Sequence, residues 1–168
     1  MAVAESRPVM HPLCIKSVYT GKRPLKILFI TATRIGDAVL SSGLLAHLAG
    51  QFPNVRFTVA CGAPAAPLFE AVPGLDRLIV IEKKPFHSHW LSLWAACAGH
   101  RWDRIYDLRG SMLARFMFAG ERHIGDYRDD SIHRVEELGR MVGVVPPPAP
   151  KLWLSEQARK EAAALMPE

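Results

Sequence analysis

Residues 25–37 read LKILFITATRIGD, an apolar run that ends in a polar turn. The run itself, residues 25–31, is rich in strand formers and nearly continuous, which is typical of a central parallel strand covered on both faces. From Asp37 onward the apolar residues recur at steps of three and four, as on the buried face of a helix: Leu40, Leu44, Leu45, Leu48 and Phe52. Pro53 ends that helix. The stretch therefore predicts a strand, a tight turn and a helix.

The same alternation continues along the chain. Further strands are expected at 56–61, 78–81 and 104–108, with a short one at 123–125. Helical segments are expected at 67–72, at 90–97, from 113 onward and at 132–142. Strands separated by helices cannot form hairpins, so the connections are crossovers and the sheet is parallel. The predicted fold class is α/β, a Rossmann-like parallel sheet sandwich.

The 168 residues suffice for one compact domain with additions. Residues 1–24 are expected to be an N-terminal extension, because prolines and a glycine interrupt every short apolar group there. Residues 25–145 form the predicted domain. The run PPPAP at 146–150 indicates a semi-rigid linker, and the helix-like segment 155–166 is too short for a second core. We interpret 146–168 as a linker and the start of a missing C-terminal domain, with a helix that packs back on the first domain as the alternative.

The charge balance points to anionic partners. A net charge of +5 and a pI near 9.4 suit a phosphorylated glycolipid, an acidic membrane surface or nucleic acid. Nucleic acid is disfavoured, because the basic residues form no block and are not interleaved with aromatic ones. No stretch is long enough to span a bilayer. The cysteines, Cys14, Cys61 and Cys97, are far apart and show no zinc or disulfide spacing, which favours a cytoplasmic location.

The turn at 31–37 is the expected ligand site, because open α/β sheets bind ligands at the carboxyl ends of their strands. Arg34 can attract an anion, and Gly36 allows a close backbone approach or a positive φ. Asp37 has two interpretations that can coexist: it caps the helix, or it accepts a proton from a substrate hydroxyl. The turn lacks the three-glycine dinucleotide fingerprint and the P-loop lysine, which disfavours a nucleotide-dependent oxidoreductase.

Other chemically interesting residues have structural explanations. His87 and His89 have no evident third ligand, and the adjacent Asp129 and Asp130 are typical of a solvated loop, so no metal is assigned. Trp90 and Trp94 share helical spacing with Leu91 and Cys97. We expect the two tryptophans to pack in the core or an interface; the alternative is an exposed patch that meets a membrane.

Four segments together resemble glycosyltransferase family 9, the lipopolysaccharide heptosyltransferases. The opening, KILFI at 26–30 followed by RIGDAVL at 34–40, is similar to the start of that family. PGLDRLI at 73–79, YDLRGS at 106–111 and HRVE at 133–136 resemble later family segments in the same order. The likeness covers roughly 25–145. Arg109 is a departure, because the family commonly has Gln there; the added charge fits a different anionic acceptor or a salt bridge with a nearby carboxylate.

The resemblance implies a two-domain GT-B enzyme of which this chain is the N-terminal, acceptor-binding half. It implies an inverting, metal-independent transfer from a nucleotide sugar, typically an ADP-heptose, to a lipopolysaccharide-core acceptor at the cytoplasmic face of the inner membrane. The donor would bind the missing C-terminal domain, and no cofactor is expected in this half. The rival hypothesis is a noncatalytic Rossmann-like domain that binds an anionic glycolipid or a protein partner.

Residue roles follow from the same resemblance. Asp37 is expected to be the catalytic base that takes the acceptor's proton. Arg34 and Arg109 are expected to hold phosphate or carboxylate groups of the acceptor. The remaining predicted acceptor contacts are Thr33, Gly36, Ser111 and His133.

Overall fold

The computed structural model describes residues 23–82, 88–125 and 131–165, without the side chains of 88–90. Five strands form one sheet in the order β3-β2-β1-β4-β5, and every neighbouring pair is parallel. The strands are β1 (Leu25–Ile30), β2 (Val55–Gly62), β3 (Leu75–Ile81), β4 (Trp102–Asp107) and β5 (Ala119–Ile124). The predicted α/β class and the Rossmann-like parallel sheet are confirmed.

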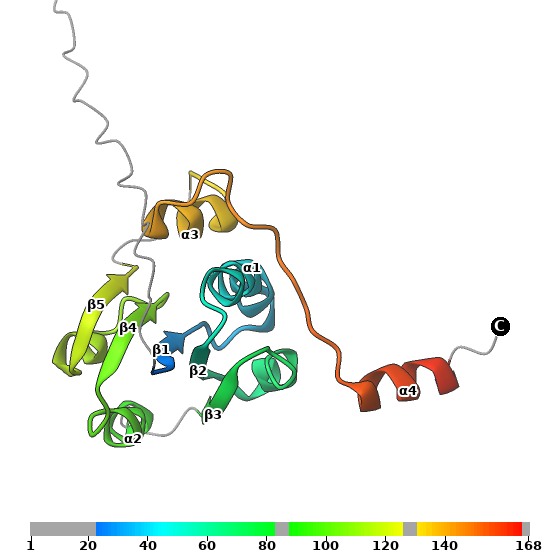
Figure 1. Cartoon of the computed structure of the whole chain (residues 1–168), viewed down its shortest axis with the longest axis horizontal. Coiled ribbons are helices and arrows are strands. Elements are labelled where there is room, and N and C mark those ends of the chain that lie inside the picture. Colours follow the sequence, from blue (N-terminus) through cyan, green and yellow to red (C-terminus); the bar gives the residue numbers. More distant parts are fainter. Residues whose placement is uncertain (1–22, 83–87, 126–130, 166–168) are drawn as a thin grey trace, which may run out of the picture.

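Helices cover both faces of the sheet (Figure 1). One face carries α1 (Ile35–Gln51), the 3₁₀ helix η1 (Ala63–Leu68) and α3 (Arg134–Val142), which share a core with alternate strand residues such as Phe29 and Phe57. The other face carries α2 (Ser88–Cys97) and the 3₁₀ helix η3 (Met112–Phe116), packed on residues such as Leu28 and Ile105. Because both faces are covered, β1 is buried at five of its six positions, as its apolar run predicts.

Three predicted helical segments differ from the structure. The one expected at 67–72 is the 3₁₀ helix η1, which ends at Leu68. The helix expected from Leu113 is a five-residue 3₁₀ helix, because β5 already begins at Ala119 and requires a short connection. On α2, Cys97 is buried as its spacing suggests, whereas Trp94 does not pack in the core, one of the two placements expected for it. Leu93 and Cys97, four residues apart, are the side chains that pack on the sheet, while Leu91 is 73% exposed and Trp94 is 42% exposed.

The proline-rich segment runs along α1 rather than away from the domain. A Cβ atom at Gly43 would lie 2.4 Å from the Ala149 carbonyl oxygen, so the linker backbone rests directly on the helix at this point. The Lys151 amide then donates to Ser42 Oγ at 3.0 Å. The final helix, α4 (Glu156–Leu165), starts where Ser155 caps it by accepting from the Ala158 amide, and it has no buried residue.

Several residues raised by the sequence fall outside the described part of the chain. These are residues 1–22, with Cys14, and His87, Asp129 and Asp130; the side chains of His89 and Trp90 are outside it as well. Within the described ranges, no helix combines the length and the apolar character needed to cross a bilayer.

Candidate functional site

The sheet has a topological switch point between β1 and β4. From β1 the chain moves outward through β2 and β3, and it then returns to the other side of β1 to form β4 and β5. Ile30 and Asp107 pair in register at the carboxyl ends of β1 and β4. Loops that leave neighbouring strands in opposite directions open a crevice, which is where α/β sheets bind ligands. Residues 31–37 and 108–111 therefore flank the expected crevice.

The turn after β1 is held on two sides. Thr31 is fully buried; its amide donates to the Ala60 carbonyl at 2.9 Å, and its hydroxyl lies 2.7 Å from Ser41 Oγ on α1. Thr33 rests against the end of β2, where a Cβ atom at Gly62 would lie 2.6 Å from the Thr33 carbonyl oxygen. The turn is thus fixed between β2 and α1, which gives the residues that follow a defined position.

Arg34, Gly36 and Asp37 lie on successive positions at the start of α1. Arg34 is the N-cap residue, in extended conformation at φ −84° and ψ 138°, and it is exposed. Gly36 is helical, because α1 begins at Ile35, so of its two predicted alternatives the positive φ does not occur. No atom lies within 4 Å of a Cβ atom built on Gly36, and the space beside it is open. Its predicted role in close substrate approach stays a prediction.

Asp37 is half-buried in the first turn of α1. Its carboxylate interacts favourably with the positive end of the helix dipole there. The N-cap position belongs to Arg34, so Asp37 is not the N-cap residue. The side chain, being half-buried, is therefore not sealed in the core.

The turn after β4 is organised by a buried carboxyl group. Asp107 has no exposed surface, and its two oxygens accept from the amides of Arg109 at 3.0 Å and Ser111 at 2.8 Å. Burial raises the pKa of Asp107 above its ordinary value, while the hydrogen bonds from Ser111 and Arg109 oppose that rise. Gly110, at φ 63°, supplies the left-handed conformation that this tight turn needs.

Arg109 and Ser111 were both predicted acceptor contacts. Arg109 is exposed, so the loop presents its side chain at the surface after β4. The Ser111 hydroxyl donates to Asp107 at 2.5 Å, so its own proton is used in shaping the turn. Asp107 was expected only as a member of the YDLRGS motif, and its anchoring role was not predicted. The signal available was a carboxylate that ends an otherwise buried strand and precedes a glycine turn.

The start of α3 lies beside the carboxyl end of β4. His133, a predicted acceptor contact, is the exposed N-cap residue of α3, and its Nδ1 accepts from the Val135 amide at 3.3 Å. Its neighbour Arg134 reaches back to the sheet, donating to the Leu108 carbonyl at 2.8 Å and pairing with Glu137 at 2.6 Å. Both residues belong to the HRVE segment, and Arg134 is the one that contacts the end of β4.

A cavity of about 220 Å³ lies between the ends of β4 and β5 and α3. Its lining comprises Leu108, Ile124, Gly125, Arg134, Glu137, Leu138 and Met141. Arg134 is therefore the side chain that links this cavity to the predicted site segments. Among the described residues, no three His, Cys, Asp or Glu side chains converge as metal ligands would.

Comparisons with known proteins identify the fold. No protein-family model and no curated protein sequence matches the chain. Among solved structures, it is similar to a family 9 glycosyl transferase from Veillonella parvula, with a TM-score of 0.60, 18% identity, and coverage of 83% of this chain and 48% of that one. It is also similar to E. coli ADP-heptose lps heptosyltransferase II, with a TM-score of 0.60, 19% identity, and coverage of 84% and 50%.

A third similar structure is E. coli heptosyltransferase WaaC with ADP, with a TM-score of 0.56, 11% identity, and coverage of 84% of this chain and 53% of that one. The chain thus spans about half the length of the structures it matches. The predicted resemblance to glycosyltransferase family 9 is confirmed at the level of the fold, and the chain has the Rossmann-like α/β architecture found in GT-B heptosyltransferases.

Proposed function

We propose that this chain is the N-terminal, acceptor-binding half of an inverting, heptosyltransferase-like glycosyltransferase. The observation that carries the proposal is the place of Asp37: half-buried, in the first turn of α1, beside the switch point between β1 and β4. The likeness to heptosyltransferase structures supports the same reaction class. Fold alone does not determine function, so the weight falls on the site residues.

Asp37 is the proposed general base. It takes the proton of an acceptor hydroxyl while that oxygen forms a bond to the anomeric carbon of the donor. The bond from this carbon to the nucleoside diphosphate breaks with its electron pair, and the configuration inverts. A carboxylate is chemically suited to this proton transfer, and groups of the other half would stabilise the departing diphosphate. No step requires a metal or a cofactor from this half.

The acceptor's anionic groups are proposed to bind the two arginines at the crevice. Arg34 and Arg109 are exposed on the loops that leave β1 and β4, the adjacent strands of the switch point. Backbone amides at the start of α1 add donors that suit a phosphate. Thr33, Gly36, Ser111 and His133 complete the proposed acceptor site, with Arg134 as an addition from the structure.

The donor is proposed to be a nucleotide sugar of the ADP-heptose type, bound by a C-terminal half outside this chain. Support comes from E. coli WaaC, which has been solved with ADP and with ADP-2-deoxy-2-fluoro heptose. The acceptor is proposed to be a lipopolysaccharide core at the cytoplasmic face of the inner membrane.

A membrane contact next to the site is part of this proposal. Met112, Phe116 and Phe118 are between 67% and 72% exposed, and they follow Ser111 directly along the chain. Arg115 stands among them, and net positive charge favours anionic lipid. Exposed apolar side chains with basic neighbours are typical of surfaces that bind the lipid interface. A glycolipid acceptor could then reach Arg109 from the bilayer.

A transfer assay tests the proposed function. The chain is produced together with its continuation into the donor half and incubated with ADP-heptose and a lipopolysaccharide-core acceptor in vesicles. We expect a glycosylated acceptor whose new linkage has the inverted anomeric configuration by NMR. Acceptor binding without transfer would support the noncatalytic alternative, and a retained configuration would contradict the role of Asp37 as base.

A further inference from the structure

A second cavity, lined partly by polar side chains, lies beside the C-terminal part of α1, at the other end of this helix from Asp37. His47 is ten residues beyond Asp37 on α1, which places it about 15 Å along the helix axis. A cavity of about 250 Å³ opens beside it, between the C-terminal part of α1, β4 and the end of α3. The lining residues are His47, Leu48, Gln51, Arg104, Tyr106, Val142, Gly143, Val144 and Val145.

Arg104 is the buried cation of this cavity. Only 7% of the residue is exposed, and its guanidinium lies 4.9 Å from the centre of the Phe52 ring. Its Nε pairs with Glu121 at 3.0 Å and its Nη1 donates to the Tyr106 hydroxyl at 3.4 Å. A guanidinium carries five N–H donors, so these two bonds use a minority of its capacity.

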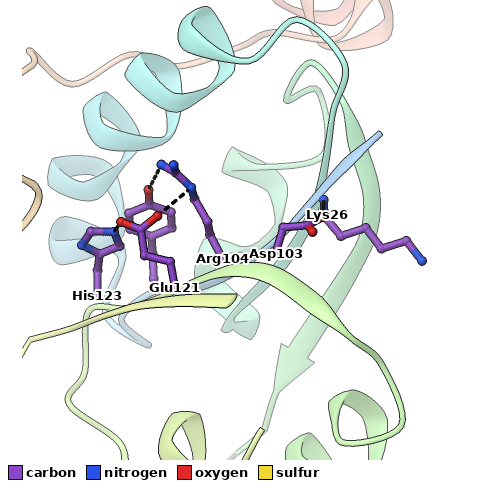
Figure 2. A network of polar contacts seen from close by, with 6 residues as sticks. Lys26, Asp103, Arg104, Glu121 and His123 are labelled. Atoms are coloured by element: carbon purple, nitrogen blue, oxygen red, sulfur yellow. Dashed lines mark hydrogen bonds and ion pairs between the residues drawn. The ribbon is translucent and has the colours of Figure 1, made fainter. Parts of the chain in front are cut away.

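The partners of Arg104 are themselves held in place (Figure 2). The second oxygen of Glu121 lies 2.8 Å from His123 Nε2. The His123 ring stacks on Tyr106 with the ring centres 4.6 Å apart and the planes 3° from parallel. Arg104 and Tyr106 are therefore positioned rigidly from the side of β5, with their polar ends at the cavity. Pre-organised donors of this kind bind a ligand at a low cost in side-chain entropy.

Hydrogen-bonding capacity at the cavity is left unused. His47 Nε2 is buried and has no hydrogen-bond partner within the described residues. The Tyr106 hydroxyl accepts from Arg104 and keeps its own proton to donate. A buried polar atom without a partner costs free energy, and native proteins usually fill such places with water or a ligand.

We propose that this cavity binds a small organic monocarboxylate with a short apolar body. The carboxylate meets the Arg104 guanidinium, the Tyr106 hydroxyl and His47 Nε2, where charge-assisted hydrogen bonds are strong. The hydrocarbon part packs on Leu48 and the valines at 142, 144 and 145. This would be a site separate from the crevice that holds Asp37.

The charges at the cavity favour a ligand with a single negative charge over a phosphate. Glu121 already pairs with Arg104, so the two charges cancel and the cavity offers an anion hydrogen-bond donors rather than a net positive charge. Each further negative charge on the ligand would be buried without a partner, which is unfavourable, so a monocarboxylate fits better than a phosphate. The apolar residues Leu48, Val142 and Val144 suit a hydrocarbon body. Residues 143–145 form one wall and lead directly into the proline-rich segment, so an occupied cavity would brace that segment against α1.

A titration tests the proposal. Isovalerate and the uncharged isoamyl alcohol, which have the same carbon skeleton, are added separately to isotopically labelled protein and followed by NMR. We expect saturable shifts of the His47 ring nitrogens with isovalerate and binding of the alcohol at least about tenfold weaker, as loss of a charge-assisted bond predicts. Tyr106→Phe and His47→Leu should each weaken isovalerate binding by about fivefold or more, while His100→Leu, at an exposed histidine, should not.

The outcomes are distinguishable. Absence of a saturable shift at His47, or equal binding of acid and alcohol, overturns the proposal and leaves water as the occupant. Unchanged affinity in Tyr106→Phe would also overturn it; this variant loses only one hydroxyl, and its unfolding transition shows whether it is folded. Isovalerate binding by Asp37→Asn should equal wild type, because the two sites are independent.

Discussion

Ile30 and Asp107 are paired in register across β1 and β4, the two strands at which the sheet changes direction. Ile30 leads into the turn that carries Arg34 and Asp37, and Asp107 fixes the turn that carries Arg109. One pair of neighbouring strand ends thus places a carboxylate and two cations at the same edge of the sheet. This arrangement is the basis on which we propose the crevice as the acceptor site.

Asp107→Asn is expected to loosen the turn after β4. The amide nitrogen of Asn cannot accept from Ser111, so the two bonds at that oxygen are lost in a buried place. We expect a loss of about 1–3 kcal/mol in the free energy of unfolding, measured by urea denaturation. Asp76→Asn, at an exposed carboxylate on β3, is the control and should change stability little. Equal stability of both variants would refute the anchoring role.

The difference in stability between wild type and Asp107→Asn is expected to depend on pH. Burial raises the pKa of Asp107 in the folded state above 3.8, so folding favours its protonated form. Its contribution to stability is fully present below the unfolded pKa and declines as pH rises through the folded pKa. The stability gap between wild type and Asp107→Asn should therefore narrow as the pH rises above 3.8. A gap that widens over this range would contradict the raised pKa.

Gly62→Ala is expected to displace the turn after β1. The new methyl group would lie within 3 Å of three Thr33 atoms, two of them backbone, so the turn must move. We expect destabilisation of about 1–3 kcal/mol in thermal unfolding together with reduced transferase activity. Gly50→Ala is the matched control, because no atom lies within 4 Å of a Cβ atom on this helical glycine. It should be neutral or stabilising by up to about 1 kcal/mol.

Gly43→Ala is expected to lift the proline-rich segment from α1. Its methyl group would collide with the carbonyl of Ala149, and the bond from the Lys151 amide to Ser42 would be strained or broken. Hydrogen exchange at the Lys151 amide should accelerate, while the sheet amides keep their protection. Gly50→Ala, on the same helix, should leave Lys151 unchanged. Equal exchange rates at Lys151 in wild type and Gly43→Ala would show that the contact is unimportant.

Cys61 and Cys97 are expected to be unreactive in the folded protein. Burial raises the pKa of each thiol to about 11, and the thiolate is the reactive form. At about pH 8, iodoacetamide should modify both slowly in the native state and rapidly after unfolding, as followed by peptide mass spectrometry. Rapid native modification at either position would contradict the packing of β2 or α2.

The sequence was most informative where burial is uniform. β1 and the helix after it were predictable, because a continuous apolar run and a three-and-four periodicity leave few alternatives. β5 was expected only at 123–125, since its sequence AGERHI mixes small and charged residues and half-buried edge strands carry a weak pattern. The exposure of Trp94 on α2 could not be predicted, because large aromatic residues at helical spacing do not reveal which side of the helix meets the sheet.

The candidate site, like the fold, could be predicted from the sequence only in part. The turn after β1 could be located from the rule that ligands bind at strand ends, and Asp37 from its place in that turn. The strand order, and hence the meeting of the β1 and β4 loops, depends on long-range pairing that a single sequence does not encode locally. For the same reason, the closeness of Arg134 to Leu108, separated by 26 positions, was not foreseen. The positive φ, one of the two alternatives for Gly36, does not occur because the helix begins two residues earlier than expected.

The most direct test of the central claim compares turnover in the protein that includes the donor half. Asp37→Asn keeps the size of the side chain and removes the base, so kcat should fall by about 100-fold or more, with the KM for the acceptor nearly unchanged. Asp76→Asn should retain wild-type turnover. A kcat for Asp37→Asn equal to that of Asp76→Asn would contradict the assignment of Asp37 as the group that accepts the acceptor's proton.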